Sequence, residues 1–306
     1  MSLDSMNQIF EEMEKQGKPF WEIVLLTDME DRQVTRAESI AKMLTVWQAM
    51  QDAADSYTGS RRSVSGLVGG DGMKMRQYAR RGQAMSGGYV SEVIAEALSM
   101  AESNACMRRI VAAPTAGACG VLPAVLLPLC KYEELTQHQI LEALYVASGI
   151  GAVIAYRACI AGAAGGCQAE IGTAAAMAAG ALVAIRGGSG RQIGHAVAMA
   201  LKNLMGLACD PVAGLVEVPC VKRNVIGAVD AISAADMALA GVESRIPVDE
   251  VIDAMGEVGR RLPVELRETA LGGLAATPTG KEIKQRMHEE ALKARESKKL
   301  NFSDIF

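Results

Sequence analysis

The chain has 306 residues and a mass of 32.2 kDa, enough for one large domain or two ordinary ones with a sizeable core. Half of its residues are hydrophobic but only 4% are aromatic, so small and aliphatic side chains must form that core. A net charge of −4 and a pI of about 5.6 leave no basic surface for nucleic acid, and we exclude that partner.

The first segment, residues 1–17, is acidic and amphipathic, unlike a secretory signal with a basic start and an apolar centre. Seven Cys without closely spaced pairs are typical of reduced thiols or metal ligands rather than disulfides. We therefore expect a cytoplasmic protein. The longest apolar stretches, 143–156 and 171–185, fall short of the roughly 20 residues that span a bilayer. We expect buried core helices there, and no membrane partner.

Helical spacing first appears over residues 4–16 and 33–57. In the second segment apolar residues recur at i, i+3, i+4, i+7 and i+10 from Ile40, which marks one face of a helix. Residues 21–26 form a short apolar run that fits either a strand or a docking segment. Residues 65–72 include four glycines and predict a loop.

From residue 90 onward the pattern is almost wholly helical. We predict helices at about 90–105, 118–131, 136–161, 169–186, 189–206, 223–242, 247–260 and 280–297. The central segments are apolar nearly all round, as expected of helices surrounded by other helices, so 136–206 should form a buried hairpin or bundle. Residues 186–190 predict a helix C-cap followed by the N-cap of the next helix.

The fold class predicted is all-α: a multi-helix globular domain with buried central helices. We divide the chain into an N-terminal helical layer (1–60), a main domain with the site (61–280) and a charged C-terminal helix or tail (281–306). Together these parts make effectively one domain.

Three cysteines stand in breaks between the helical segments. Cys167 follows two glycines, Cys209 precedes Asp-Pro, and Cys220 follows a proline. Several sulfurs can meet at such breaks, and soft thiolates select zinc, copper(I) or iron–sulfur clusters. Cys167 could lie at a helix N-terminus, a position that lowers a thiol pKa. On spacing alone each of the three fits a small buried hydrophobe as well, which is our interpretation of Cys106, Cys119, Cys130 and Cys159.

The sequence around these cysteines is more specific than their spacing. Residues 165–172 read GGCQAEIG, residues 209–224 read CDPVAGLVEVPCVKRN, and residues 113–120 read APTAGACG. In this arrangement they closely resemble the alpha chain of bacterial iron–sulfur-dependent L-serine dehydratase. The resemblance covers about residues 60–280 and includes RETALGG at 267–273.

The resemblance implies a [4Fe-4S] cluster held by Cys167, Cys209 and Cys220. Three protein ligands leave one iron open to substrate, where it can act as a Lewis acid on the hydroxyl that leaves. The reaction implied is the conversion of L-serine into pyruvate and ammonia through aminoacrylate, without pyridoxal phosphate. Three-ligand coordination therefore suits the chemistry.

Residues near these motifs are candidates for binding substrate. The hydroxyl of Thr115 and the backbone N–H groups around Ala116 and Gly117 lead into an apolar helical run and could hold the serine carboxylate. The alternative is a Pro/Gly helix start with no ligand. Glu170, Asn203, Arg223 and Asn224 lie close to the cysteines in sequence and either orient substrate and sulfurs or are structural. Asn203 stands where single-chain relatives often carry His.

The general base is not apparent in the sequence. The chain has only three His, at 138, 195 and 288, and none stands in a catalytic context. In the resembled family a beta region carries a Ser/His motif, so we expect an alpha–beta complex in which the beta chain supplies the base. The C-terminal extension lacks the Cys with which single-chain relatives end. A higher oligomer is left open.

Two other functions fit parts of the pattern. A related lyase could remove sulfide from cysteine, because an open iron can bind a thiolate as well as a hydroxyl. A non-catalytic scaffold subunit could instead hold structural zinc, although it would need a fourth protein ligand.

Overall fold

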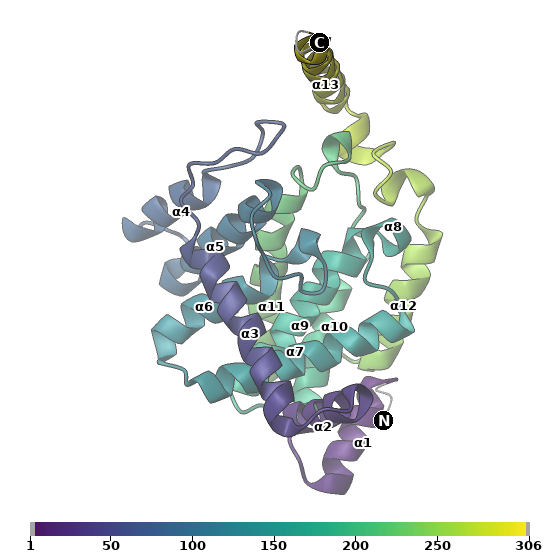
Figure 1. Cartoon of the computed structure of the whole chain (residues 1–306). Coiled ribbons are helices and arrows are strands. Elements are labelled where there is room, and N and C mark those ends of the chain that lie inside the picture. Colours follow the sequence, from purple (N-terminus) through teal and green to yellow (C-terminus); the bar gives the residue numbers. More distant parts are fainter. Residues whose placement is uncertain (1–3, 304–306) are drawn as a thin grey trace.

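The computed structural model describes residues 4–303, with side chains as far as residue 293. This part of the chain is all-α, as predicted (Figure 1), and its extended pairing is limited to an isolated bridge between Cys209 and Arg267. The longer helices are α1 (Met6–Gln16), α2 (Phe20–Arg32), α3 (Arg36–Asp55), α4 (Asp71–Arg80), α5 (Gly87–Ala105), α6 (Val121–Glu133), α7 (Gln137–Arg157), α9 (Thr173–Ile185), α10 (Gly190–Leu204), α11 (Cys220–Leu239), α12 (Val248–Arg261) and α13 (Pro278–Ser303).

Short helical turns connect several of these helices. They are η1 (Ala116–Ala118), α8 (Gly162–Gly165), the π-helical η2 (Gln168–Gly172), η3 (Val212–Gly214), η4 (Val264–Leu266) and η5 (Gly273–Ala276). Most of them flank the predicted ligand cysteines, so the site is built from irregular segments carried by regular helices.

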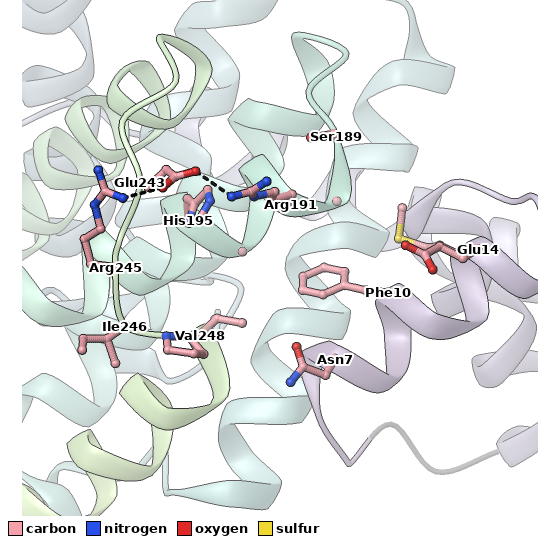
Figure 2. A pocket seen from close by; sticks show the side chains of 14 residues that line it. Asn7, Phe10, Glu14, Ser189, Arg191, His195, Glu243, Arg245, Ile246 and Val248 are labelled. Atoms are coloured by element: carbon pink, nitrogen blue, oxygen red, sulfur yellow. Dashed lines mark hydrogen bonds and ion pairs between the residues drawn. The ribbon is translucent and has the colours of Figure 1, made fainter.

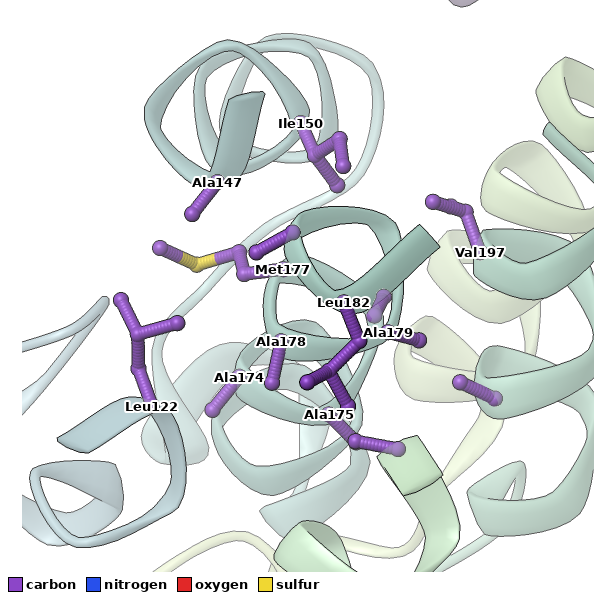
Figure 3. Close-up of a cluster of buried hydrophobic side chains, with 14 of the residues drawn as sticks. Leu122, Ala147, Ile150, Ala174, Ala175, Met177, Ala178, Ala179, Leu182 and Val197 are labelled. Carbon is purple, nitrogen blue, oxygen red and sulfur yellow. The ribbon is translucent and has the colours of Figure 1, made fainter. Parts of the chain in front are cut away.

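Helix α9 is the centre of the core and is buried at every residue from Thr173 to Val183. Figure 3 shows its alanines facing side chains of α6, α7 and α10, among them Leu122, Ile150 and Val197. Small residues let these helices approach closely. This packing confirms the predicted buried bundle over 136–206.

By length and composition alone, two helical segments in the described part of the chain are long and apolar enough to cross a membrane: Gln137–Arg157 and Gln168–Ile185. Their most apolar windows are 61% and 83% buried inside the protein. This burial agrees with the interpretation of both segments as core helices.

The apolar run at 21–26 belongs to helix α2, so the strand suggested for it is wrong, whereas the segment does dock on another element, helix α7. The buried residues Phe20, Ile23, Val24 and Thr27 follow a helical period that the short run concealed. Val24 packs on α7 where Gly149 leaves room, since a Cβ at 149 would lie 2.4 Å from Val24 Cγ2.

Helix α4 was missed in the sequence because its start depends on a distant residue. The predicted loop is found only as far as Gly70, and α4 begins at Asp71. The buried carboxylate of Glu102, on α5, accepts hydrogen bonds from the N–H groups of Gly70, Asp71 and Gly72 at 3.0, 2.8 and 3.4 Å. It also accepts the Tyr57 hydroxyl. Glu102 thus takes the place of a local N-cap.

The two predicted caps at residues 186–190 are present. Arg186 ends α9, and Ser189 begins α10 with a capping box to Gln192. At the other end of the chain, α13 projects from the body of the molecule (Figure 1) and agrees with the predicted charged helix. It is held near its base, where Arg286 donates to the backbone oxygen of Ser65 at 3.1 Å. Residues 304–306 of that prediction lie outside the described residues.

Candidate functional site

The turn η3, which lies between two of the predicted ligand cysteines, packs against η5 and α13. Cys167 connects α8 to η2, Cys209 follows α10, and Cys220 is the first residue of α11. Their exposed fractions are 3%, 2% and 8%. Two of the thiols therefore come from inter-helix segments and the third from the start of a helix, and all three are buried.

The three thiols share one electrostatic neighbourhood. The pKa of Cys209 is raised by burial first, and then by Cys167, Glu170 and Cys220. Burial likewise raises the pKa of Cys167 to about 11 and that of Cys220 to about 12. The lowered pKa expected for Cys167 is wrong for the chain alone, because desolvation outweighs the nearby Arg223 guanidinium. A bound cation is the influence that would ionise these thiols.

Arg223 ties the three cysteine segments together from α11. Its guanidinium donates to the backbone oxygen of Ala208 at 2.6 Å and to Asp210 Oδ1 at 2.8 Å, and it hydrogen-bonds the sulfur of Cys167. The second oxygen of Asp210 accepts the N–H of Leu274 at 2.8 Å. Asp210 is buried, so this ion pair is well shielded from water.

Cys209 is held on both sides by the segment that carries RETALGG. Its N–H donates to the oxygen of Leu266 at 2.8 Å, and its own oxygen accepts the N–H of Glu268 at 2.7 Å. The RETALGG motif is apparent in the sequence, but its contact with Cys209 could not be predicted because it joins residues almost 60 apart.

The backbone beside Cys167 is fixed by Gln168, which the sequence analysis missed. The buried Gln168 amide donates to the oxygens of Gly165 and Met255 at 2.9 and 3.1 Å and accepts the N–H of Gly206 at 2.8 Å. Gly259 of α12 packs on the same turn, since a Cβ there would lie 2.8 Å from Gly165 Cα. The only signal for Gln168 in the sequence was its place beside the cysteine.

The turn at 115–117 lies against Glu170. The Thr115 hydroxyl donates to Glu170 Oε1 at 2.6 Å. Burial raises the pKa of the Glu170 carboxyl, and this hydrogen bond opposes the rise. The turn forms η1 rather than the first turn of α6, which begins later, at Val121. Thr115 and Glu170, predicted separately, thus form one unit.

Asn224 fixes the shape of that turn. Its side chain is fully buried, donates to the oxygens of Gly117 and Cys220 at 2.8 and 3.0 Å, and accepts the N–H of Gly120 at 2.8 Å. The N–H groups of Ala116 and Gly117 have no partner within residues 4–303. Asn224 therefore connects the candidate carboxylate site to the ligand segment of Cys220.

Asn203 is the one candidate that is engaged elsewhere. Its amide donates to Asp230 Oδ1 at 2.6 Å and so joins α10 to α11. Burial raises the pKa of Asp230 to about 6, and its Oδ2 has no partner among the described residues. The structure thus places Asn203 in a helix–helix contact.

The two large surface cavities lie away from this site. One, of about 650 Å³, separates α1 from α10 and the segment 243–248 (Figure 2), and the other, of about 750 Å³, lies among α3 to α6. None of the candidate residues lines either. His195 borders the first and accepts the Ser244 N–H at 3.3 Å through Nδ1, which fits a structural His.

Fold and site together define an all-α enzyme domain whose polar site is formed by inter-helix segments at one end of a small-residue bundle. The family model described as serine dehydratase alpha chain matches residues 15–275. The chain belongs to the serine dehydratase alpha-chain family.

Similar proteins cover most of the chain. A probable L-serine dehydratase alpha chain from Bacillus subtilis is 45% identical over 92% of this chain and 93% of its own length. The L-serine dehydratase alpha chain of Peptoniphilus asaccharolyticus is 40% identical over 92% of this chain and 97% of its own length. L-serine dehydratase TdcG from Escherichia coli is 38% identical over 79% of this chain, but only 55% of its own length is covered.

Proposed function

We propose that this chain is the alpha subunit of an L-serine dehydratase, a lyase that converts L-serine into pyruvate and ammonia through aminoacrylate. Family membership over most of the chain supports the reaction. The observation that carries the proposal is that the Cys209 thiol and the Thr115–Glu170 unit flank one point at Gly162, with Cys167 and Cys220 near enough to Cys209 to raise its pKa. We place the enzyme in the cytoplasm, where thiols stay reduced.

We infer that Cys167, Cys209 and Cys220 hold a [4Fe-4S] cluster. Thiolates are the protein ligands of such clusters, and these three thiols are buried, with Cys167 close enough to the other two to raise the pKa of both. Within the described residues, no three His, Cys, Asp or Glu side chains, the three cysteines included, are grouped to hold a single ion. A zinc scaffold would also need a fourth protein ligand. When bound, a cluster with three protein ligands supplies an open iron for the leaving hydroxyl. The proposal needs no pyridoxal phosphate.

The chain's own residues then bind and orient the substrate. We infer that the N–H groups of Ala116 and Gly117 bind the serine carboxylate, because these N–H groups are otherwise unpaired in the described chain. Thr115, whose hydroxyl donates to Glu170, holds that carboxyl beside the bound substrate. Asn224 keeps the turn in shape. Arg223 orients Cys167 and the segment of Cys209 through the contacts described above.

We propose that a beta chain completes the enzyme and supplies the general base. The similar proteins of matching length are named alpha chains, whereas the chain spans about half of TdcG. Among the candidate residues at this site, the acidic side chain is Glu170, and no His is found among them. A proton acceptor from a second chain is consistent with this set of residues.

The test is anaerobic cluster reconstitution of the chain with and without its beta partner, followed by assays of pyruvate from serine and sulfide from cysteine. We expect about four iron and four sulfide per chain and serine turnover that depends on the partner. Changing any of Cys167, Cys209 or Cys220 to Ser should remove iron and turnover together. Cys130→Ser, at a partly buried thiol of α6 outside the site, is the control and should keep both.

Three results would contradict the proposal. About one zinc per chain would favour the scaffold, preferred release of sulfide from cysteine would favour the related lyase, and full turnover by the alpha chain alone would remove the need for a partner. Retained turnover in Cys209→Ser with an intact cluster would refute the ligand assignment.

A further inference from the structure

The carboxylate of Glu170 faces both the Thr115 turn and the thiol of Cys209. A Cβ on Gly117 would lie 3.2 Å from Glu170 Oε1. A Cβ on Gly162 would lie 2.6 Å from Glu170 Oε2 and 3.1 Å from Cys209 Sγ. The close approach at Gly162 leaves no room for a side chain there, so Glu170 and Cys209 flank the same point.

Glu170 is the acidic side chain of this site that lacks a cation. In the part of the chain that the structure describes, its carboxylate accepts the Thr115 hydroxyl and forms no ion pair. Asp210, in contrast, is paired with Arg223 and with the N–H of Leu274. A partly buried carboxylate without a cation is costly, and that cost is relieved when a ligand supplies positive charge.

The proposed substrate carries such a charge next to its carboxylate. In an α-amino acid, the ammonium and carboxylate groups share one carbon atom. A carboxylate bound by the N–H groups of Ala116 and Gly117 therefore places the ammonium within reach of Glu170, whose Oε1 accepts the neighbouring Thr115 hydroxyl at 2.6 Å. The remaining side-chain hydroxyl is then free to turn toward Cys209.

We propose that Glu170 binds the substrate's ammonium group and so makes the site specific for α-amino acids over hydroxy acids that lack the amine. This inference rests on the proposed function and deepens it. Glu170 is a specificity-determining residue in this assignment, and the proton-transfer role stays with the beta chain.

The experiment compares Glu170→Gln with the wild type in the anaerobically reconstituted alpha–beta complex. Gln keeps the shape and removes the charge, so the KM for L-serine should rise about 10- to 100-fold, as expected for a lost hydrogen bond to a charged group. The kcat should change little, as for an interaction shared by ground and transition states. Inhibition by 3-hydroxypropanoate, which is serine without its amino group, should stay unchanged.

The matched control is Glu257→Gln, which removes the same charge from an exposed carboxylate of α12 outside the site and should leave the serine KM unchanged. Iron content must equal that of the wild type in both variants. An unchanged serine KM in Glu170→Gln overturns the inference, and so does a loss of kcat at constant KM. A wild-type complex with full iron and no serine turnover would contradict the proposed function instead.

A second variant covers the case in which Glu170→Gln does not take up iron. Glu170→Asp keeps the charge one methylene further from the substrate and should raise the serine KM less than about tenfold. Inhibition by 3-hydroxypropanoate should again be unchanged. An equal weakening of both ligands would indicate a general distortion of the site and would contradict the assignment.

Discussion

At the scale of single residues, Arg223 joins helix α11 to the segments of Cys167 and Cys209 through one charged group. One guanidinium contacts the oxygen of Ala208, the carboxylate of Asp210 and the sulfur of Cys167. A planar group with several donors in fixed directions suits this task, whereas a Lys ammonium cannot reproduce it. Arg223 was only one of several polar candidates in the sequence, because its partners come from two other segments.

We expect Arg223→Ala to destabilise the chain by about 3 kcal/mol, because it leaves the Asp210 carboxylate buried without its cation. Urea unfolding at pH 7 measures the change. Lys222→Ala is the neighbouring control, since its exposed ammonium reaches Asp71 at 3.4 Å and should contribute less than about 0.5 kcal/mol. Equal unfolding midpoints for the two variants would show that Arg223 has no such role.

The sequence motifs identified the cysteines, Thr115, Glu170 and Asn224 as candidates, and the structure gathers these residues at one end of the bundle. Gln168 and Asp210 were missed although they adjoin Cys167 and Cys209. Gln168 and Asp210 contact residues of other segments, and the spacing of neighbouring residues in the sequence cannot predict such contacts. The thiol pKa was misjudged for a similar reason, since burial depends on the tertiary structure.

At the scale of elements, helix periodicity predicted most of the central helices to within a few residues. The caps at Thr136 and Ser189 are local features, and both form capping boxes. Helix α4, in contrast, could not be predicted from the local sequence. The N–H groups at its start donate to the carboxylate of Glu102, about 30 residues away. The residue before Asp71 is a glycine, which has no side chain that could cap the helix.

Glu102→Gln should therefore destabilise α4 in particular. The variant replaces one oxygen that accepts backbone N–H groups by an amide donor, at an expected cost of about 2 kcal/mol. Hydrogen exchange of the amides in 71–80 should become faster than that of α9. Glu92→Gln, on the exposed face of the same helix α5, changes a carboxylate that accepts the Tyr132 hydroxyl at 3.3 Å and should leave exchange unchanged. Uniform acceleration throughout the chain would argue against a local role for Glu102.

At the scale of the whole molecule, a close contact between two glycines joins helix α12 to the segment that carries Cys167. Gly259 of α12 rests on Gly165, two residues before Cys167. The all-α class and the buried centre could be predicted from composition and period. Which helices approach this closely could not, because the contact pairs glycines that are 94 residues apart.

Gly259→Ala should destabilise the chain by about 1–2 kcal/mol. Ala favours a helix by up to about 1 kcal/mol, but its Cβ would clash with the backbone of Gly165, and overpacking of this kind costs about 1–3 kcal/mol. Thermal unfolding measures the balance, and iron uptake after reconstitution should fall as Cys167 shifts. Gly172→Ala is the control, since its Cβ would meet nothing nearer than 3.8 Å. Equal stability of both variants would contradict the argument.

The alanine-rich α9 also decides which kinds of change this protein can tolerate. Most large cores lose stability when side chains are shortened, because cavities open. Here many central side chains have already been reduced to a methyl group or less, from Thr173 to Val183, so there is little left to remove. Substitution by a larger side chain is the more destabilising change, because each added methylene pushes one helix away from another. Natural variation at the centre of this family should therefore be confined to exchanges among Gly, Ala and Ser.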